Sequence, residues 1–491
     1  MGFGVLAAAL SSGCAGLHTA SRHAGNRLAY EAYLRGLIHE RRAQLPEALE
    51  SYRAALAQDR DSAHLHVRMG AAYVKMGQAD QALTAFERAL SLDPENADAL
   101  RWLAMLYASQ GRVDDAIAVY ERLQARDPDD RFILSTLADL YVLRGDLPHA
   151  VRMYDQLIRD VGGSSQLHFN LGVLYSRLGR FDDAIAELSH AFELSPEAVE
   201  IRVALGVTYE MAGAPGKAAA HYEAAIAEDP FNARLYHHAA RAHAAQRQYA
   251  EAAANYETAL DLTPHDLDAI MGLVRIRIAQ QQYDRAQELL ARKMQEMGAS
   301  AELYVALGIV LREADQAEDA MRAFEHAVAL KEEYTQAHFY LGAQLDRLGQ
   351  KAEARLRLQR VLALDADHPD ALNYLGYMDA EAGEHLTEAK QLIERAVALD
   401  PQNGAYLDSL GWVHYRLGDT ARAIVLLERA AELMDDDPVV FDHLGEAYFR
   451  QHEFDAARRN WDRALELDPN QAEVRAKLER LPPLDTTVST P

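Results

Sequence analysis

The stretch MGAAYVKMGQADQALTAFERALSLDPENA, residues 69–97, contains the pattern that decides the fold of this chain. Its apolar and small residues recur every three or four positions in two blocks, which lie on either side of Gly77. This spacing puts them on one face of a helix in each block, while Gly77 and Pro94 mark the helix ends. The stretch therefore predicts two short helices that pack against each other as a hairpin.

The same pattern recurs along the chain with a period of 34 residues. One alanine marks each of 13 copies, with a single inserted residue before the last three: Ala48, Ala82, Ala116, Ala150, Ala184, Ala218, Ala252, Ala286, Ala320, Ala354, Ala389, Ala423 and Ala457. A fixed period of this size indicates a solenoid, in which each unit packs only on its neighbours and the stack presents one long binding surface.

The residue order within a unit resembles the tetratricopeptide repeat, on the positions of Met69, Gly70, Tyr73, Gly77, Ala82, Phe86, Ala89 and Pro94. The resemblance covers residues 29 to 471 and implies an all-α, right-handed superhelical solenoid of about 13 helix-turn-helix repeats. The units are expected to start near residues 29, 63, 97, 131, 165, 199, 233, 267, 301, 335, 369, 404 and 438. Residues 472–481 are expected to form a terminal capping helix, and residues 482–491 a disordered tail.

The chain contains one cysteine, Cys14, which follows an apolar stretch at residues 3–10 and the small residues 11–13. This arrangement resembles a bacterial lipoprotein signal, in which the chain is cut before a cysteine that then carries lipid. We therefore expect a signal peptide at 1–13, and the lipidated Cys14 with a tether at 14–28. In lipoproteins of this kind, an aspartate directly after the cysteine marks retention in the inner membrane. This chain has Ala15 there, so the resemblance implies the outer membrane, facing the periplasm. No Lys or Arg precedes the apolar stretch, so a cytoplasmic chain and a misplaced start codon stay open as alternatives.

The composition and the lack of catalytic or metal-binding motifs argue against several classes of function. A net charge of −25 argues against nucleic acid, since phosphate contacts need clustered Lys and Arg. The adjacent His237 and His238 do not face one metal ion on a helix, and no second cysteine exists for a zinc site. No serine, histidine and acid grouping has a catalytic motif around it. We therefore expect no enzyme activity, no cofactor and no metal; the expected partners are other proteins or extended peptide segments, with membrane contact through the lipid anchor alone.

In the repeat family, the first helix of each unit lines the binding groove. In the last four units this resemblance assigns to the partner-binding groove Phe339, Tyr340, Tyr374, Tyr377, Asp408, Trp412, Tyr415, Asp442, Glu446 and Phe449. A secondary groove is expected at His237, His238, Arg241 and Arg275, which form a local basic island. The alternative is that half of the aromatic rings belong to the core between helices, because helical spacing alone does not separate the two.

Three C-terminal stretches resemble a narrower group, the proteobacterial tetratricopeptide repeat lipoproteins: NYLGY at 373–377, LDSLGWVHYRLG at 407–418 and HLGE at 443–446. Some members of that group bind a periplasmic carboxyl-terminal processing protease and deliver substrates to it. The resemblance implies a protease adaptor of the cell envelope. The alternative is a general assembly factor for a secretion, pilus or polysaccharide machine.

Overall fold

The computed structural model describes residues 27–482, apart from the side chain of Val161. Within this range the secondary structure consists of α-helices joined by short turns, with no strands. The chain divides into two compact units, one ending at Gln246 and the other beginning at Arg247. The predicted all-α solenoid of helix-turn-helix repeats is confirmed.

The N-terminal unit begins with a helix at residues 27–41, called the N-terminal helix below. It continues with α2 (Leu45–Gln58), α3 (Ala63–Lys75), α4 (Ala79–Leu92), α5 (Ala97–Ser109), α6 (Val113–Arg126), α7 (Arg131–Arg144), α8 (Leu147–Val161), α9 (Ser165–Arg177), α10 (Phe181–Leu194), α11 (Val199–Met211), α12 (Pro215–Glu228) and α13 (Ala233–Ala245).

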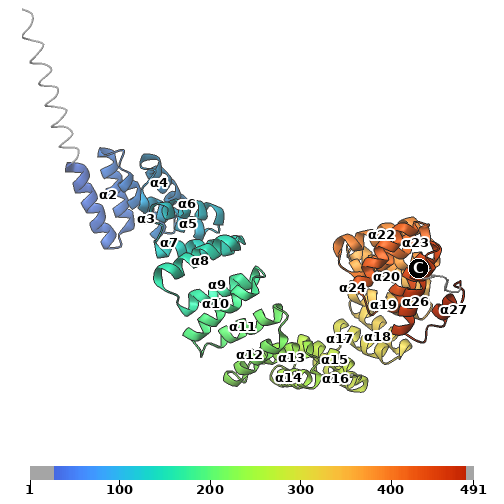
Figure 1. Cartoon of the computed structure of the whole chain (residues 1–491). Helices are drawn as coiled ribbons and strands as arrows, with labels where there is room; N and C mark the ends of the chain where they lie inside the picture. The colour runs from blue at the N-terminus through green and yellow to red at the C-terminus, as the bar shows by residue number, and fades with distance from the viewer. Residues whose placement is uncertain (1–26, 483–491) are drawn as a thin grey trace, which may run out of the picture. The chain divides into compact units, whose positions relative to one another are not determined.

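The C-terminal unit contains α14 (Tyr249–Leu262), α15 (Leu267–Ala279), α16 (Tyr283–Met297), α17 (Ala301–Glu313), α18 (Ala317–Leu330), α19 (Thr335–Arg347), α20 (Lys351–Leu364), α21 (Pro369–Ala382), α22 (Leu386–Leu399), α23 (Gly404–Leu417), α24 (Thr420–Leu433), α25 (Pro438–Arg450), α26 (Phe454–Leu467) and α27 (Ala472–Glu479). Figure 1 shows this order within each unit.

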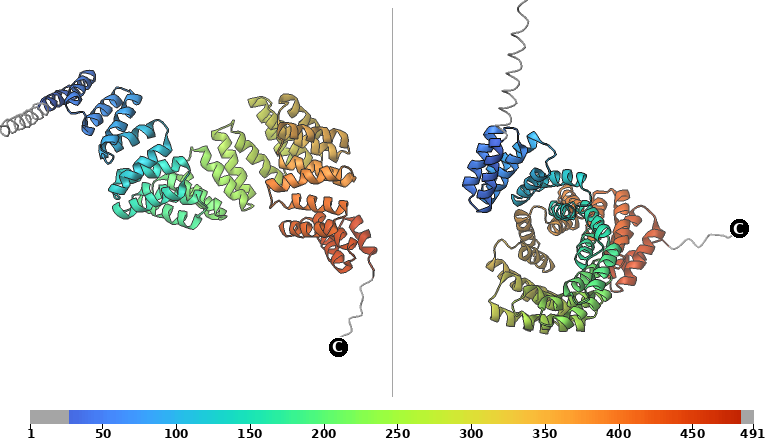
Figure 2. Two further views of the ribbon diagram at one scale, coloured as in Figure 1. Left: turned by 90° about the horizontal axis from the view of Figure 1, so that it is seen from above. Right: turned by 90° about the vertical axis from the view of Figure 1, so that its left-hand side faces the viewer.

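Consecutive helices pair as hairpins, such as α3 with α4 and α17 with α18, and Figure 2 shows the hairpins of each unit stacked side by side. A left-handed residue closes the turn of most hairpins. At Gly77, where φ is 71°, the absence of a Cβ makes this conformation inexpensive. Arg247 and Asp315 adopt it with side chains, at φ 60° and 59°. The turn geometry is thus imposed by helix packing and not by glycine alone.

Small residues let the two helices of a hairpin approach closely. A Cβ added to Gly308 on α17 would lie 2.4 Å from the ring of Phe324 on α18, and one on Gly445 would lie 2.4 Å from Trp461. Both aromatic side chains are fully buried. The large residue of the second helix therefore occupies the space that the small residue of the first helix leaves open.

In each unit the stack curves toward the first helices of the hairpins. Consecutive first helices contact each other, as α15 does with α17, α17 with α19, α21 with α23 and α23 with α25. Among the helices described, no two consecutive second helices are in comparable contact. We call the surface formed by the first helices the inner face.

Candidate binding surface on the first helices

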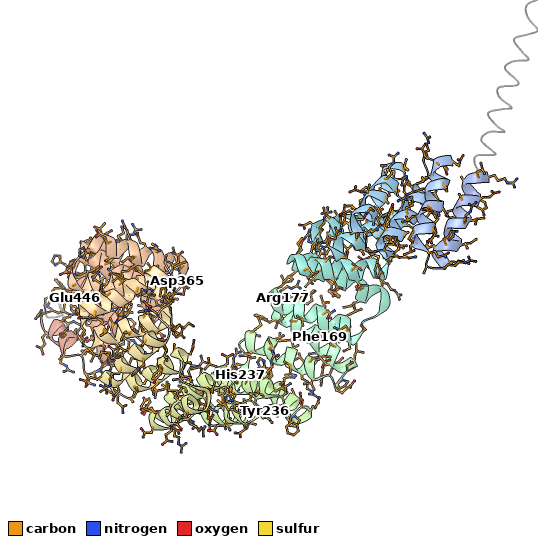
Figure 3. The ribbon with its side chains drawn as sticks, turned by 180° about the vertical axis from the view of Figure 1, so that it is seen from behind. Phe169, Arg177, Tyr236, His237, Asp365 and Glu446 are labelled. Carbon is orange, nitrogen blue, oxygen red and sulfur yellow. The ribbon has the colours of Figure 1, made fainter. Side chains whose placement is uncertain are left out.

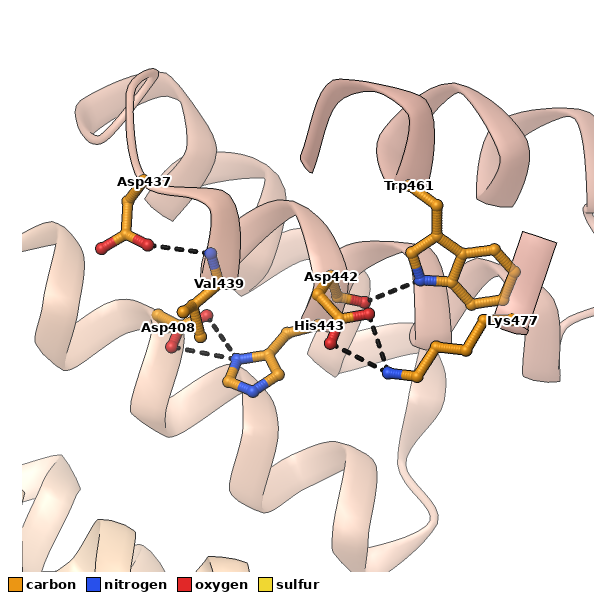
Figure 4. Close-up of polar contacts among 7 residues, drawn as sticks. All are labelled: Asp408, Asp437, Val439, Asp442, His443, Trp461 and Lys477. Carbon is orange, nitrogen blue, oxygen red and sulfur yellow. Dashed lines mark hydrogen bonds and ion pairs between the residues drawn. The ribbon is translucent and has the colours of Figure 1, made fainter. Parts of the chain in front are cut away.

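Side chains from three successive first helices, α21, α23 and α25, fill the C-terminal section of the inner face. His443 on α25 is buried, and its Nδ1 lies 2.9 and 3.1 Å from the carboxylate oxygens of Asp408 on α23 (Figure 4). The Trp412 ring stacks on the imidazole with centroids 4.1 Å apart, and the Tyr377 ring on α21 lies 6.4 Å from it. Three of the residues that the sequence assigns to the groove, Tyr377, Asp408 and Trp412, thus surround His443, which the sequence did not assign to it.

The electrostatics of this section favour a charged histidine. Burial by itself would lower the pKa of His443, but the Asp408 carboxylate at hydrogen-bond distance, with Asp442 and Glu381 nearby, raises it above the ordinary value. The ring and the Asp408 carboxylate form a buried hydrogen-bonded pair, which is an ion pair when the ring is protonated, so neither group is available to a partner without breaking the pair.

Tyr415 belongs to the same packed layer. Its ring stacks on Trp412 with centroids 4.9 Å apart, and the guanidinium carbon of Arg450 lies 3.6 Å from its centroid. Its hydroxyl donates a hydrogen bond of 3.1 Å to Glu446. Tyr415 is buried, whereas Trp412 is half-buried and keeps part of its surface toward solvent.

The last predicted residues face the terminal helix α27. The Lys477 ammonium on α27 donates to Asp442 at 2.8 and 2.9 Å and lies 2.9 Å from Glu446. Burial opposes the charge of Lys477, but hydrogen bonds to these two carboxylates raise its pKa overall. Phe449 packs beside Trp461, whose indole N–H donates to the backbone oxygen of Asp442 at 3.3 Å (Figure 4). Both acidic side chains therefore have partners within the chain, although the single ammonium balances only one of the two negative charges.

Phe339, Tyr340 and Tyr374 form a half-buried aromatic group on α19 and α21. The Phe339 ring meets Tyr374 edge-on at 6.2 Å, and Tyr340 stacks on the buried Phe324 at 5.6 Å. The Tyr374 hydroxyl donates to Asp346 at 3.0 Å, and burial with this carboxylate raises the pKa of Tyr374. These rings keep an exposed edge on the inner face.

An open cavity of about 380 Å³ lies between α15, α17 and α19 of the inner face. Aliphatic side chains line most of it: Leu267, Met271, Val274, Ile278, Val305, Ala306 and Ile309. Polar groups at its edge are Asp268, Arg275, Glu302 and Gln336, together with Tyr334 and Tyr340. Two residues expected from the sequence, Tyr340 and Arg275, thus lie at one cavity.

The sequence interpretation missed the aliphatic wall of this cavity. Met271 and Val305 lie one repeat period apart, as do Arg275 and Ile309, so they occupy matching positions of neighbouring first helices. That register is the one signal that could have found them. An aliphatic residue on an amphipathic helix is usually assigned to the core, and it was therefore overlooked.

The other three residues of the secondary groove lie on α13 of the N-terminal unit, where Figure 3 labels His237 beside Tyr236. His238 stacks on Tyr222 at 5.1 Å, and burial lowers its pKa. The Arg241 guanidinium lies 2.7 Å from Glu210, so its charge is paired on α11. The fourth residue of the secondary groove, Arg275, lies on α15 of the C-terminal unit, at the cavity described above.

First helices of the N-terminal unit also expose apolar side chains, namely Met105 on α5 and Phe132 and Leu143 on α7. Met105 occupies the repeat position that Arg275 has at the cavity, and Phe132 that of Asp268. Met105 and Phe132 therefore place exposed apolar side chains on the inner face of this unit.

A larger cavity, of about 1050 Å³, lies on the other side of α15, between α14 and α16. Its most buried cation is already paired: Lys293, which is 5% exposed, donates to Glu296 at 2.8 Å and to the Pro264 carbonyl at 2.9 Å. Arg277 likewise contacts Glu257. Because Lys293 joins α16 to the turn between α14 and α15, and Arg277 joins α15 to α14, we assign these contacts to the stability of the repeat.

Cys14 and the expected signal peptide lie outside the described residues, as does the expected tail from residue 483 onward. No helix in the described range 27–482 has the length and apolar character needed to cross a bilayer. Over the same residues, no group of three or more His, Cys, Asp or Glu side chains is placed to hold a metal ion.

Comparison with curated proteins gives two partial relatives. A TPR repeat-containing protein of Pseudomonas aeruginosa, PA4667, is 31% identical over 163 residues, which are 33% of this chain and 28% of that protein. Superkiller protein 3 of Schizosaccharomyces pombe is 27% identical over 186 residues, 36% of this chain and 13% of that protein. The match therefore spans less than a third of the length of either relative.

Solved structures similar to this chain include yeast Tom70, at 16% identity and a TM-score of 0.49 over 92% of this chain and 99% of that one. The Cut9–Hcn1 assembly of APC/C matches at 17% identity and a TM-score of 0.43, over 85% and 89% of the two chains.

The tetratricopeptide repeat family matches residues 67–131, 135–191, 170–233, 344–404 and 378–438, which together cover more than half of the chain. Further repeats of this family match residues 41–77, 243–307 and 438–471. Its fold is typical of non-catalytic scaffolds that bind other proteins or peptides. The chain therefore belongs to the tetratricopeptide repeat family and is a protein–protein interaction scaffold.

Proposed function

We propose that this chain is a lipid-anchored scaffold of the bacterial cell envelope whose inner face holds a segment of a partner protein. The observation that carries this proposal is the cavity between α15, α17 and α19. Its volume of about 380 Å³ suits one or two apolar side chains, and its polar edge supplies groups that orient a backbone. The partner segment would place an apolar anchor in the cavity and continue along the inner face.

The sharpest form of the proposal is an adaptor that binds a periplasmic carboxyl-terminal processing protease and its substrates. Support comes from the resemblance of residues 373–377, 407–418 and 443–446 to the repeat lipoproteins, and from the position of Cys14 after an apolar stretch. A general assembly factor is the second candidate. The exposed apolar side chains of Met105, Phe132 and Leu143 in the N-terminal unit favour it. They offer a second contact surface besides the cavity, and an assembly factor holds more than one partner.

A matched pair of variants tests the cavity. Ile309→Glu puts a carboxylate into the apolar wall, and Leu356→Glu makes the same change at an exposed position of the second helix α20. Desolvation of the new charge is expected to lower partner capture from envelope extracts by about tenfold in Ile309→Glu. Capture by Leu356→Glu should equal that of the wild type. Equal capture by both variants would remove the cavity as the contact.

The identity of the proteins lost in Ile309→Glu separates the two candidate functions. A processing protease among them supports the adaptor, and subunits of an assembly machine support the alternative. Metabolic labelling with a fatty acid analogue tests the anchor independently: label is expected in the wild type and absent in Cys14→Ala. An unlabelled wild type would end the lipoprotein proposal and leave the groove proposal standing.

A further inference from the structure

The N-terminal helix leaves an apolar stripe uncovered at the end of the N-terminal unit. One side of it packs inward through the buried Ala32 and through Gly36, where an added Cβ would lie 2.4 Å from the ring of Tyr52. On the opposite side Tyr30 is 62% exposed, Leu34 40% and Ile38 50%. These three residues are spaced four apart, so they form one continuous stripe along the helix.

Cations flank this stripe. Arg27 and Arg41 are exposed and lie two helical turns before and after Leu34, which places them on the same face. Arg35 and Arg42 are exposed at one edge. The acidic residues cancel only part of this charge. Glu31 offsets one of the four arginines by pairing with Arg27 at 3.0 Å, whereas Glu40 turns inward to Lys75 and to the Tyr52 hydroxyl, at 2.7 Å from each. A cationic surface thus lies on a chain whose net charge is −25.

The opposite end of the repeat array is built differently. Val474 and Leu478 of α27 pack on the cluster around Trp461, and the exposed residues of α27 are polar, charged or alanine. Terminal repeats need such a polar outer face to stay soluble. The exposed apolar stripe of the N-terminal helix departs from this rule, and we therefore expect another surface to cover it.

We propose that this end of the molecule lies on an anionic lipid surface. Tyr30, Leu34 and Ile38 enter the boundary between headgroups and acyl chains, and Arg27 and Arg41 contact the phosphates. Aromatic and aliphatic residues on one helix face with flanking arginines match a helix that lies in the plane of a membrane interface. A cavity of about 560 Å³ lies beside Leu34, Leu37 and Ile38. Glu40 also lines it and pairs there with Lys75 and Arg68, so Arg41 is the cation at its edge that would contact a headgroup.

A second copy of the chain is the competing occupant, and the charges disfavour it. Two antiparallel copies of the stripe would bring Arg27 of one near Arg41 of the other, where Glu31 balances only one of the two positive charges. A lipid phosphate neutralises both. The inference does not need the binding groove, and it stands without lipidation. An acyl chain on Cys14, 13 residues before Arg27, would only raise the local concentration of this helix at the bilayer.

Vesicle flotation tests the proposal with the full chain carrying Cys14→Ala, so that no lipid is attached. We expect binding to phosphatidylglycerol–phosphatidylethanolamine vesicles, weak binding to phosphatidylcholine vesicles, and loss of binding as NaCl rises from about 0.02 M to about 0.5 M. Adding Leu34→Ser and Ile38→Ser should lower the partition coefficient by about tenfold, because two aliphatic side chains no longer leave water. All chains keep residues 1–26, so any contribution from that segment cancels.

Two further variants serve as controls in the same background. Arg27→Gln with Arg41→Gln should reduce binding to anionic vesicles and its dependence on salt, while Leu356→Ser on α20 should change neither. Circular dichroism melting verifies that each variant is folded. The proposal is overturned if the parent chain does not bind anionic vesicles, or if the Leu34 and Ile38 variant binds as the parent does. A dimer by sedimentation velocity that the same variant abolishes, without vesicle binding, would assign the stripe to a second copy.

Discussion

Two sections of the inner face of the C-terminal unit differ in what their side chains do. Between α15, α17 and α19 the aliphatic residues leave an open cavity of about 380 Å³. Between α21, α23 and α25 the aromatic and charged residues meet each other, with Trp412 stacked on His443 at 4.1 Å and Asp408 paired to the same ring. The section richer in aromatic residues is thus the more completely filled one.

The comparison teaches that aromatic content does not identify an open groove. Large planar rings on neighbouring first helices reach across the curved face and stack on each other, whereas shorter aliphatic side chains leave space between helices. The filled section stabilises the stack, and the open section offers a surface to a partner. Three changes can break or sharpen this division.

The largest expected effect is on the buried ion pair. Asp408→Ala leaves the His443 imidazole buried without its counter-charge, which should destabilise the C-terminal unit by about 3–5 kcal/mol. Asp367→Ala is the control, since it removes a carboxylate from an exposed pair with Arg395 and should cost less than about 1 kcal/mol. Urea unfolding followed by circular dichroism measures both. Equal midpoints for the two variants would contradict a structural role for the filled section.

An intermediate effect is expected from the aromatic residues that the sequence assigns to partner binding. Trp412→Ala removes stacking on both His443 and Tyr415, so it should destabilise the chain by about 2 kcal/mol. Tyr374→Ala also removes the hydrogen bond to Asp346. If the filled section only stabilises the stack, the double variant melts earlier but captures partners normally when folded. Weaker capture at unchanged helicity and melting temperature would instead identify these rings as partner contacts.

The smallest expected effect is a pH dependence at His443. Its pKa is raised in the folded chain, so the stabilisation by the protonated ring is complete below about pH 6.5 and is lost as the pH rises through the folded pKa. Burial lowers the pKa values of His338 and His414, whose contributions change in the opposite direction. Melting temperatures of the wild type and His443→Gln, compared from pH 5.5 to pH 9, isolate the one group. The difference should shrink as the pH rises; a difference that grows would refute the ion pair.

Much of the fold could be read from the repeat pattern, because small residues at fixed spacing are required wherever two helices approach closely. Gly308 and Gly445 meet Phe324 and Trp461 as that pattern implies. The binding surface was less accessible to sequence reasoning. Helical periodicity tells which residues share a face, but it does not tell whether a ring such as Trp412 meets solvent or the next repeat. Whether the ten expected groove residues contact a partner stays a prediction.

The sequence by itself determined the helical hairpin and its repetition, because these depend on the spacing of small and apolar residues within one unit. The tertiary structure alone decided which inner-face side chains pack against each other and which line an open cavity. His443 and Tyr377 lie on first helices two repeats apart, and their proximity depends on how far successive hairpins rotate. That rotation is set by packing summed over many contacts, which no local stretch of sequence specifies.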